Sequence, residues 1–104
     1  MITEQATQVA ALNDAFREGG FGVTVTRGVK ELDDLAGLLR AVRMFDAFTE
    51  DNDPYGEHDF GSIIWQEETV LWKIDYYDLE LKYGELPLSR KCRRVLTVML
   101  ADEY

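Results

Sequence analysis

Apolar side chains recur at helical spacing in two stretches of the first half of the chain. Between residues 3 and 18 they fall on one face of a helix, which predicts an amphipathic helix. The pair Gly19 and Gly20 ends it, because glycine readily adopts the left-handed conformation found after helix C-termini. Residues 32–47 show the same spacing and predict a second helix. The predicted buried stripes are Val9, Leu12, Ala15 and Phe16 in the first helix and Leu35, Leu38, Leu39, Val42 and Phe45 in the second.

Alternation of apolar and polar residues, which is typical of half-buried strands, predicts three strands. They cover residues 21–26, 58–66 and 69–77, and the last two form a hairpin around Glu67 and Glu68. A four-residue turn would join these two strands and set their register. The predicted pairs on the core face are Trp65 with Val70, Ile63 with Trp72, Gly61 with Ile74 and Asp59 with Tyr76.

The remaining segments complete one α+β domain. Residues 49–56 hold nearly every turn-forming residue type and predict a loop, whereas residues 78–88 fit either a helical turn or an irregular connection. Ser89 is suited to cap a last helix over residues 90–103. The order α-β-α-β-β-α, without a βαβ repeat, predicts a single domain over residues 1–104 in which helices pack on one face of a three-stranded, mostly antiparallel sheet. The apolar stripe of the last predicted helix is Cys92, Val95, Leu96, Met99 and Leu100.

Composition and charge agree with a small folded domain and argue against several classes of protein. The 104 residues are 46% hydrophobic and carry 20 acidic against 11 basic side chains, a net charge of −9. Because phosphate backbones and anionic lipids repel such a chain, we expect no direct binding to nucleic acid or membrane. The single cysteine, Cys92, precludes an internal disulfide. With neither a signal peptide nor an apolar run of about 18 residues, we expect a cytoplasmic protein.

The acidic side chains concentrate in the centre of the chain. Residues 46–85 contain twelve acids and two bases, a net charge of −10. Self-repulsion there costs stability unless a cation or a basic partner offsets it, so we expect a surface that binds a basic protein. The expected binding residues are Glu50, Asp51, Asp53, Glu57, Asp59, Asp75, Tyr77 and Asp78.

A basic cluster follows the acidic centre at the start of the last predicted helix. It consists of Arg90, Lys91, Arg93 and Arg94. The helix dipole disfavours positive charge at that end, so helix stability does not explain these residues. An internal contact with the acidic centre is the favoured interpretation, and a patch for a small anion or nucleic acid is the alternative.

Oxygen donors and one imidazole crowd into residues 51–59, which suggests a cation site. A calcium loop starting at Asp51 fails, because Tyr55 stands at its fifth position and Ser62 at its twelfth, where a bidentate Glu is needed. Zinc or iron would need more His or Cys than the single His58. We therefore favour a structural loop over a regulatory cation site and expect no metal and no cofactor.

The one constellation suited to acid–base chemistry is His58 with Asp59 and Asp75. No Ser or Cys lies in a nucleophile motif, and no glycine-rich phosphate loop is present. The predicted pairing also turns Asp59 toward Tyr76 on the core face, which favours a buried, hydrogen-bonded carboxylate. We therefore predict no catalytic residue and retain, as the alternative function, a small hydrolase or metal-dependent enzyme that uses these three residues.

Five blocks of the sequence resemble a family of small, uncharacterised bacterial proteins described only as a domain of unknown function. The most distinctive are residues 45–61, FDAFTEDNDPYGEHDFG, and residues 72–78, WKIDYYD, and the others are residues 11–17, 26–29 and 94–101. The resemblance implies a setting on proteobacterial chromosomes, plasmids and other mobile elements. It carries over no activity and no catalytic residue.

Charge and resemblance together lead to one functional hypothesis. We expect a non-enzymatic, acidic interaction module that binds the basic, nucleic-acid-binding surface of another protein. In its most specific form it mimics nucleic acid and inhibits a host defence effector of the CRISPR or restriction type. Carboxylates on alternate residues of an extended segment lie about 6.6 Å apart, close to twice the spacing of about 3.4 Å between phosphates on one DNA strand.

Overall fold

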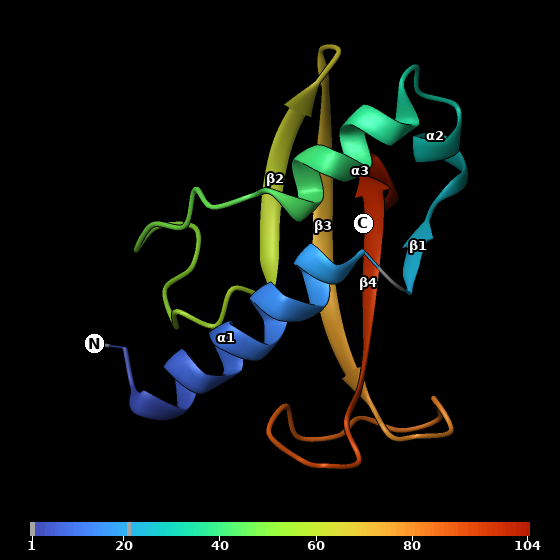
Figure 1. Cartoon of the computed structure of the whole chain (residues 1–104). Coiled ribbons are helices and arrows are strands. Elements are labelled where there is room, and N and C mark those ends of the chain that lie inside the picture. The colour runs from blue at the N-terminus through green and yellow to red at the C-terminus, as the bar shows by residue number, and fades with distance from the viewer. Residues whose placement is uncertain (1, 21) are drawn as a thin grey trace.

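Four strands form one mixed sheet at the centre of the computed structural model, which describes residues 2–20 and 22–104. β4 runs antiparallel to β3 and parallel to β1, in the order β1-β4-β3-β2 (Figure 1). The α+β class is confirmed, but the sheet has four strands rather than three, and the order α-β-α-β-β-α is wrong because the last segment is a strand. The strands are β1 (Val23–Val25), β2 (Phe60–Trp65), β3 (Glu68–Tyr77) and β4 (Arg93–Leu100).

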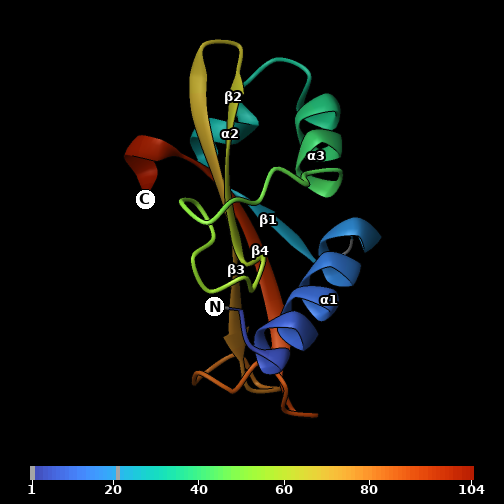
Figure 2. The same cartoon turned by 90° about the vertical axis from the view of Figure 1, so that its left-hand side faces the viewer.

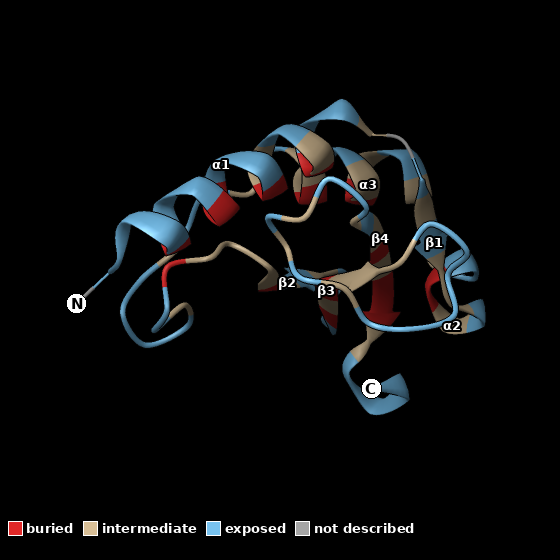
Figure 3. Ribbon diagram, turned by 90° about the horizontal axis from the view of Figure 1, so that it is seen from below, coloured by how far each residue is buried: buried red, intermediate tan, exposed pale blue. Residues whose placement is uncertain are grey.

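Helices pack on one face of this sheet. α1 (Glu4–Gly19) and α3 (Leu35–Arg43) lie on the same side of it, and the 3-10 helix η1 (Ala101–Glu103) lies on the other (Figures 2 and 3). The short helix α2 (Arg27–Lys30) directly follows β1. Within the described residues, none of the helices has the length and apolar character that a membrane span requires.

A single apolar core fills the space between α3 and the sheet. Leu38 and Val42 of α3 are buried there with Trp72 of β3 and with Leu96 and Val98 of β4. These five side chains come from three elements that are far apart in the sequence. Their burial from water therefore drives the assembly of the helices and the sheet as one unit.

α1 turns inward a different face from the one that its apolar residues predict. Its ends are as expected, because Thr3 accepts a hydrogen bond from the Ala6 N–H and Gly20 (φ 72°) closes the C-terminus. Leu12, however, is 46% exposed and Ala15 is exposed, so the predicted stripe is wrong at these positions. The buried residues of α1 are Ala6, Val9, Ala10, Asn13 and Arg17.

The helix predicted over residues 32–47 is shorter than expected. α3 begins after Asp34, whose carboxylate accepts a hydrogen bond from the Gly37 N–H (3.1 Å), and it ends at Arg43. Phe45 lies beyond the helix and packs edge-on against the Trp72 ring at a centroid distance of 5.5 Å. The chain leaves the helix early, and residues 49–56 form a loop, as predicted.

The β2–β3 hairpin has the predicted faces but a different register. Its loop holds two residues, Gln66 and Glu67, rather than four, so Trp65 pairs with Glu68. Both loop residues have positive φ (51° and 70°), the geometry of the tightest hairpin turns. The register differs from the prediction by two residues, so every side chain keeps its predicted face, because alternate residues share a face. The observed core-side pairs are Gly61 with Trp72 and Ile63 with Val70.

The helix predicted over residues 90–103 is wrong, because this segment contains β4 and η1. Leu96 and Val98 point into the core and Thr97 lies between them on the other face, so the apolar residues that fit a helical stripe also fit a strand. β4 lies between β1 and β3 and forms ladders with both. The hydrogen bonds of these ladders satisfy the backbone N–H and C=O groups of β4. A local sequence pattern cannot show such pairing with distant segments.

The remaining strand and connection agree with the sequence. Of the strand predicted over residues 21–26, Val23–Val25 is confirmed as β1, and residue 21 lies outside the described residues. Residues 78–88 form an irregular connection, which is one of the two alternatives that the sequence left open, and this connection continues to residue 92.

Replacing Glu67 with glycine should stabilise the protein by about 1 kcal/mol, because glycine adopts positive φ without the steric cost of other residues. The midpoint of urea unfolding should rise accordingly. Glu68→Gly is the matched control, since it removes the same charge one residue later, inside β3, where glycine costs roughly 0.5–1 kcal/mol. A Glu67→Gly protein no more stable than the parent would contradict the observed turn.

Candidate functional site

α1 carries a buried arginine into the core. Arg17 is 1% exposed, and its guanidinium donates to Asp14 Oδ1 (3.2 Å) and to the Phe45 carbonyl (2.9 Å). The same group lies over the Trp72 ring, 4.8 Å from its centroid, and over the Phe48 ring at 5.5 Å. Because a buried charge is costly unless it is paired, these contacts tie α1 to the sheet and to the segment that follows α3.

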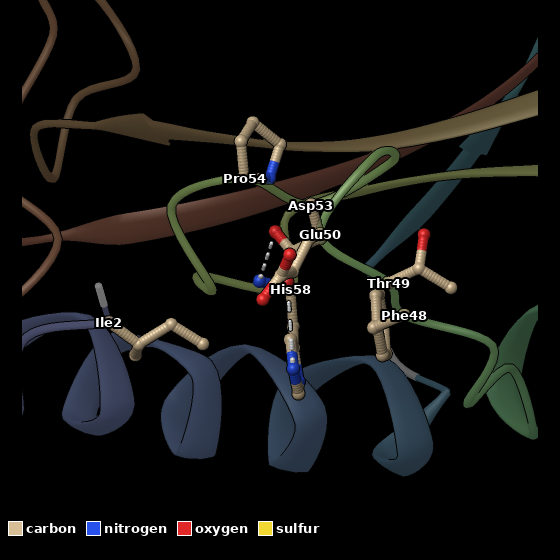
Figure 4. A pocket seen from close by; sticks show the side chains of 7 residues that line it. All are labelled: Ile2, Phe48, Thr49, Glu50, Asp53, Pro54 and His58. Carbon is tan, nitrogen blue, oxygen red and sulfur yellow. Dashed lines mark hydrogen bonds and ion pairs between the residues drawn. The ribbon is translucent and has the colours of Figure 1, made fainter.

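His58 is held between two carboxylates. Its Nδ1 lies 3.0 Å from both oxygens of Asp14, and its Nε2 lies 3.6 Å from Asp53 Oδ2. The ring stacks on Phe48 at a centroid distance of 3.8 Å, with the two planes 3° apart. The His58 backbone has φ 56°, and its N–H donates to Asp53 Oδ1 (3.3 Å). Figure 4 shows the imidazole pointing from the loop toward α1.

A hollow of about 650 Å³ opens beside this imidazole (Figure 4). Ile2 and Phe48 supply apolar walls, whereas Glu50, Asp53 and His58 supply its charged and titratable groups. In the part of the chain that the structure describes, no group of three or more His, Cys, Asp and Glu side chains is arranged to hold a metal ion. The full lining is Ile2, Phe48, Thr49, Glu50, Asp53, Pro54 and His58.

A second polar network starts at Asn13 of α1, one residue before Asp14. Asn13 is fully buried, and its amide donates to the Glu57 carbonyl (2.9 Å) and to the Tyr76 hydroxyl (2.8 Å). Its oxygen accepts a hydrogen bond from Arg94 Nε (2.7 Å). The Tyr76 hydroxyl in turn donates to Asp59 Oδ2 (3.4 Å). The sequence predicts a buried, hydrogen-bonded carboxylate at Asp59: the hydrogen bond with Tyr76 is confirmed, but the residue is only partly buried.

Burial, together with nearby negative charge, raises three pKa values at this end of the sheet. Burial raises the pKa of Asp59, and repulsion from Asp53 raises it further, although hydrogen bonds to the backbone and to Tyr76 oppose the shift. Burial also raises the pKa of Glu57, with repulsion from Asp59 and Asp53 adding to it. Burial raises the pKa of Tyr76 to about 12, so its hydroxyl keeps the proton that it donates to Asp59. The folded protein thus holds these carboxylates in an environment that disfavours their ionised form.

The structure divides the predicted binding residues into two groups. We call residues 50–59 the acidic loop, and five of the eight predicted residues lie in it. Asp75 and Tyr77 belong to the opposite face of the sheet, where Asp75 forms an ion pair with Lys73 (3.1 Å). Asp78 accepts a hydrogen bond from the Lys82 N–H (2.9 Å) in the irregular connection. The five residues of the acidic loop are Glu50, Asp51, Asp53, Glu57 and Asp59.

The proposed acid–base constellation is not assembled as predicted. His58 and Asp59 are neighbours in the chain, but His58 turns to Asp14 and Asp53, whereas Asp59 turns to Tyr76. Asp75 follows the alternation of β3 onto the face opposite α1 and α3. The carboxylates that contact the imidazole are therefore different from those that the sequence suggested.

Within the described residues, the basic cluster contacts the acidic centre without an ion pair. Among the described residues, neither Arg90, Lys91, Arg93 nor Arg94 forms an ion pair with a carboxylate. Arg94 instead donates to Asn13 and to the Pro87 carbonyl (2.7 Å), and Arg93 is exposed. Arg94 and Arg93 pair with Tyr76 and Tyr77 of β3, and the Arg94 guanidinium lies over the Tyr76 ring at 5.3 Å. The internal contact with part of the acidic centre is therefore found for these two residues, but strand pairing and the Tyr76 ring make it rather than carboxylates.

Sequence reasoning missed the residues of α1 that organise the site. Asn13, Asp14 and Arg17 contact groups that lie 28 to 81 positions away in the chain. Their one local signal is that polar residues at positions 13 and 17 share a helix face with Val9 and Ala10. A helix face that mixes polar and apolar residues in this way predicts exposure to solvent, unless the distant partners of its polar residues are known.

Comparison with known proteins identifies one related group. A family model described as "protein of unknown function (DUF3768)" matches residues 25–103. The match runs from the last residue of β1 to the end of η1 and includes the acidic loop. No curated protein and no solved structure matches the chain.

Replacing Asp59 with asparagine should stabilise the protein at neutral pH. Because the folded-state pKa of Asp59 lies above its ordinary value of 3.8, the native state binds this proton more tightly than the unfolded state does. Stability therefore falls as pH rises from 3.8 through the raised pKa, and the loss persists at pH 7. Asparagine keeps an acceptor for Tyr76 and does not ionise.

Urea unfolding of Asp59→Asn at several pH values checks this expectation. The stability advantage of the variant should be largest at neutral pH and should shrink toward zero as the solution is acidified below pH 3.8. Asp51→Asn removes the same charge from an exposed position and controls for net charge. An advantage that does not change with pH would show that ionisation of Asp59 does not strain the fold.

Proposed function

From the premise that the chain belongs to the DUF3768 family of proteins of unknown function, we propose that it is a non-enzymatic interaction module whose acidic loop binds a basic surface of another protein. The carrying observation is that no Lys or Arg among the described residues forms an ion pair with a carboxylate of the acidic loop. His58, which contacts Asp53, is the one titratable base in that segment.

The carboxylates of the acidic loop repel one another. Glu50 and Asp51 are exposed at the start of the acidic loop, and Asp53, Glu57 and Asp59 are partly buried. Burial and mutual repulsion raise the pKa values of Glu57 and Asp59. A cationic partner would remove this repulsion, and the same field would steer that partner to the loop at a rate that falls with salt.

In its most specific form, the proposal makes the chain a nucleic-acid mimic. The basic surface is then the nucleic-acid-binding surface of a host defence effector of the CRISPR or restriction type. The implied setting is a cytoplasmic protein of bacterial chromosomes and mobile elements. The carboxylates of the acidic loop would stand where phosphates bind, and Asp75, Tyr77 and Asp78 lie outside this surface.

Reversing the two exposed charges of the acidic loop should weaken partner binding at least tenfold. The partner is first captured from host lysate on the immobilised chain at low salt, eluted at high salt, identified and purified. Its affinity for the Glu50→Lys/Asp51→Lys double variant is then measured by calorimetry, with and without competing DNA. These side chains are exposed, so the melting temperature should change little.

Glu18→Lys/Asp33→Lys is the matched control. It makes the same change in net charge at two exposed positions outside the acidic loop and should retain most of the affinity. Equal binding by the loop variant and by this control would mean that overall charge, rather than the acidic loop, determines the interaction. Undiminished binding by the loop variant would refute the proposed function.

Hydrolysis with His58 as the general base is a second candidate function. It is favoured by one observation, namely that the imidazole lines the hollow while Asp14 holds its Nδ1, the arrangement by which a carboxylate orients a catalytic histidine. Asp75 takes no part in this version, because it lies on the other face of the sheet.

A screen of ester and phosphoester substrates, followed by substitution, tests this candidate. Any turnover should be lost in His58→Ala and kept in Asp75→Asn, since only the first residue borders the hollow. Turnover that survives His58→Ala would eliminate the imidazole as the base. Turnover lost only in Asp75→Asn would point to the constellation predicted from the sequence.

A further inference from the structure

The outer edge of β2 pairs with no strand among the residues that the structure describes. β2 is the last strand of the sheet on its side, and its inner edge pairs with β3 (Figure 1). In a two-residue hairpin the residues that flank the loop form a hydrogen-bonded pair, here Trp65 with Glu68. By alternation, Phe60, Ser62 and Ile64 each direct one N–H and one C=O away from β3. The Ile74 N–H, which donates to the Asp59 carbonyl (2.9 Å), agrees with this alternation.

Nothing in the described part of the chain pairs with these outward groups. The backbone hydrogen bonds outside the regular elements do not reach Phe60, Ser62 or Ile64, and no side chain bonds to their backbone. Most proteins protect such an edge with a charged residue, a proline or a bulge. β2, with the sequence FGSIIW, has no charge and no proline, and Ile64 is 70% exposed. The edge is therefore suited to accept another strand.

Both ends of this edge are acidic. Glu57 and Asp59 lie just before β2, and Glu67 and Glu68 lie just after it. The acidic loop also lies on the β2 side of the sheet (Figures 1 and 2). A strand that pairs along β2, about 20 Å long at 3.4 Å per residue, would have an uncharged centre and acidic groups facing both of its ends.

We propose that the outer edge of β2 binds an extended segment of a partner protein that has a neutral, β-branched centre and Lys or Arg at both ends. The segment adds a fifth strand to the sheet, and its basic ends meet the acidic ends of β2. This inference rests on the proposed function and names the manner in which the basic partner docks.

A second copy of the chain is not the occupant that the charges favour. When two identical strands pair in antiparallel orientation, the start of one lies beside the end of the other. The acids before β2 would then face the acids after β2 of the other copy, and like charges opposite one another destabilise strand pairing. The net charge of −9 on each copy adds to this repulsion.

The test uses the full chain and the capped peptide Lys-Lys-Val-Thr-Val-Thr-Lys-Lys. Two versions of the peptide carry N-methyl groups on alternate central residues, in one or the other of the two possible sets. An added strand directs alternate N–H groups toward β2, so one version should lose at least tenfold in affinity and the other should not. The unmodified peptide should shift the ¹⁵N-amide signals of Phe60, Ser62 and Ile64.

Two protein variants and one control complete the experiment. Ser62→Pro removes an outward N–H at a position where an edge strand tolerates proline, and Ile64→Lys places a positive charge on the exposed edge. Each should weaken peptide binding at least tenfold. Thr24→Lys makes the same charge change on an exposed residue of β1, the other edge strand, and should leave binding unchanged. If Ser62→Pro does not fold, as judged by circular dichroism, Ile64→Lys decides.

Three results would overturn the inference. If both N-methylated peptides bind equally and the signal shifts are confined to Glu50 and Asp51, the basic peptide binds the acidic loop and adds no strand to the sheet. Absence of peptide binding would also overturn it, and the charge-reversal experiment then judges the proposed function independently. A dimer in sedimentation that Ile64→Lys dissociates would assign the edge to a second copy.

Discussion

A guanidinium group that is shut away from water must find partners, and in this protein that requirement joins the parts of the site. Arg17 reaches from α1 to the Phe45 carbonyl and lies over the Trp72 ring, so a helix, the chain beyond α3 and the sheet meet at one group. Its partner Asp14 then holds His58, at the end of the acidic loop. The acidic loop is therefore tied through Asp14 to the buried guanidinium, whose own charge would be costly in the core without that carboxylate.

The parts of the fold that could be predicted are those where neighbouring residues decide the outcome. The faces of the hairpin were correct although its register was not, because Gln66 and Glu67 close a tighter turn and a change of two residues preserves alternation. β4 could not be predicted in the same way. Leu96 and Val98 fit both a helical and a strand period, and pairing with β1 and β3 decides between them.

The candidate site also contains residues that the sequence predicts and residues that it does not. The acidic loop could be recognised because its carboxylates are close in the sequence. Asp75 seemed to belong with them, but the alternation of β3 places it on the far face beside Lys73. Asn13 and Arg17 escaped notice for the opposite reason, since each is buried by partners from distant segments while apolar Leu12 is exposed. Polarity alone therefore predicts the wrong buried face for α1, because hydrogen bonds offset most of the free-energy cost of burying polar side chains there.

The place of β4 in the sheet has a consequence for the chain as it is synthesised. β1 pairs with β4 through Val25 and Val98, so the ribosome must add more than seventy residues after β1 before this ladder can form. The β2–β3 hairpin can form earlier, but the edge of β3 that pairs with β4 stays unpaired until β4 has been synthesised. At about 5–20 residues per second this interval lasts on the order of seconds, during which apolar strands are exposed. Chaperones that bind extended apolar segments would meet this protein at that stage, when both sides of the hairpin are still open.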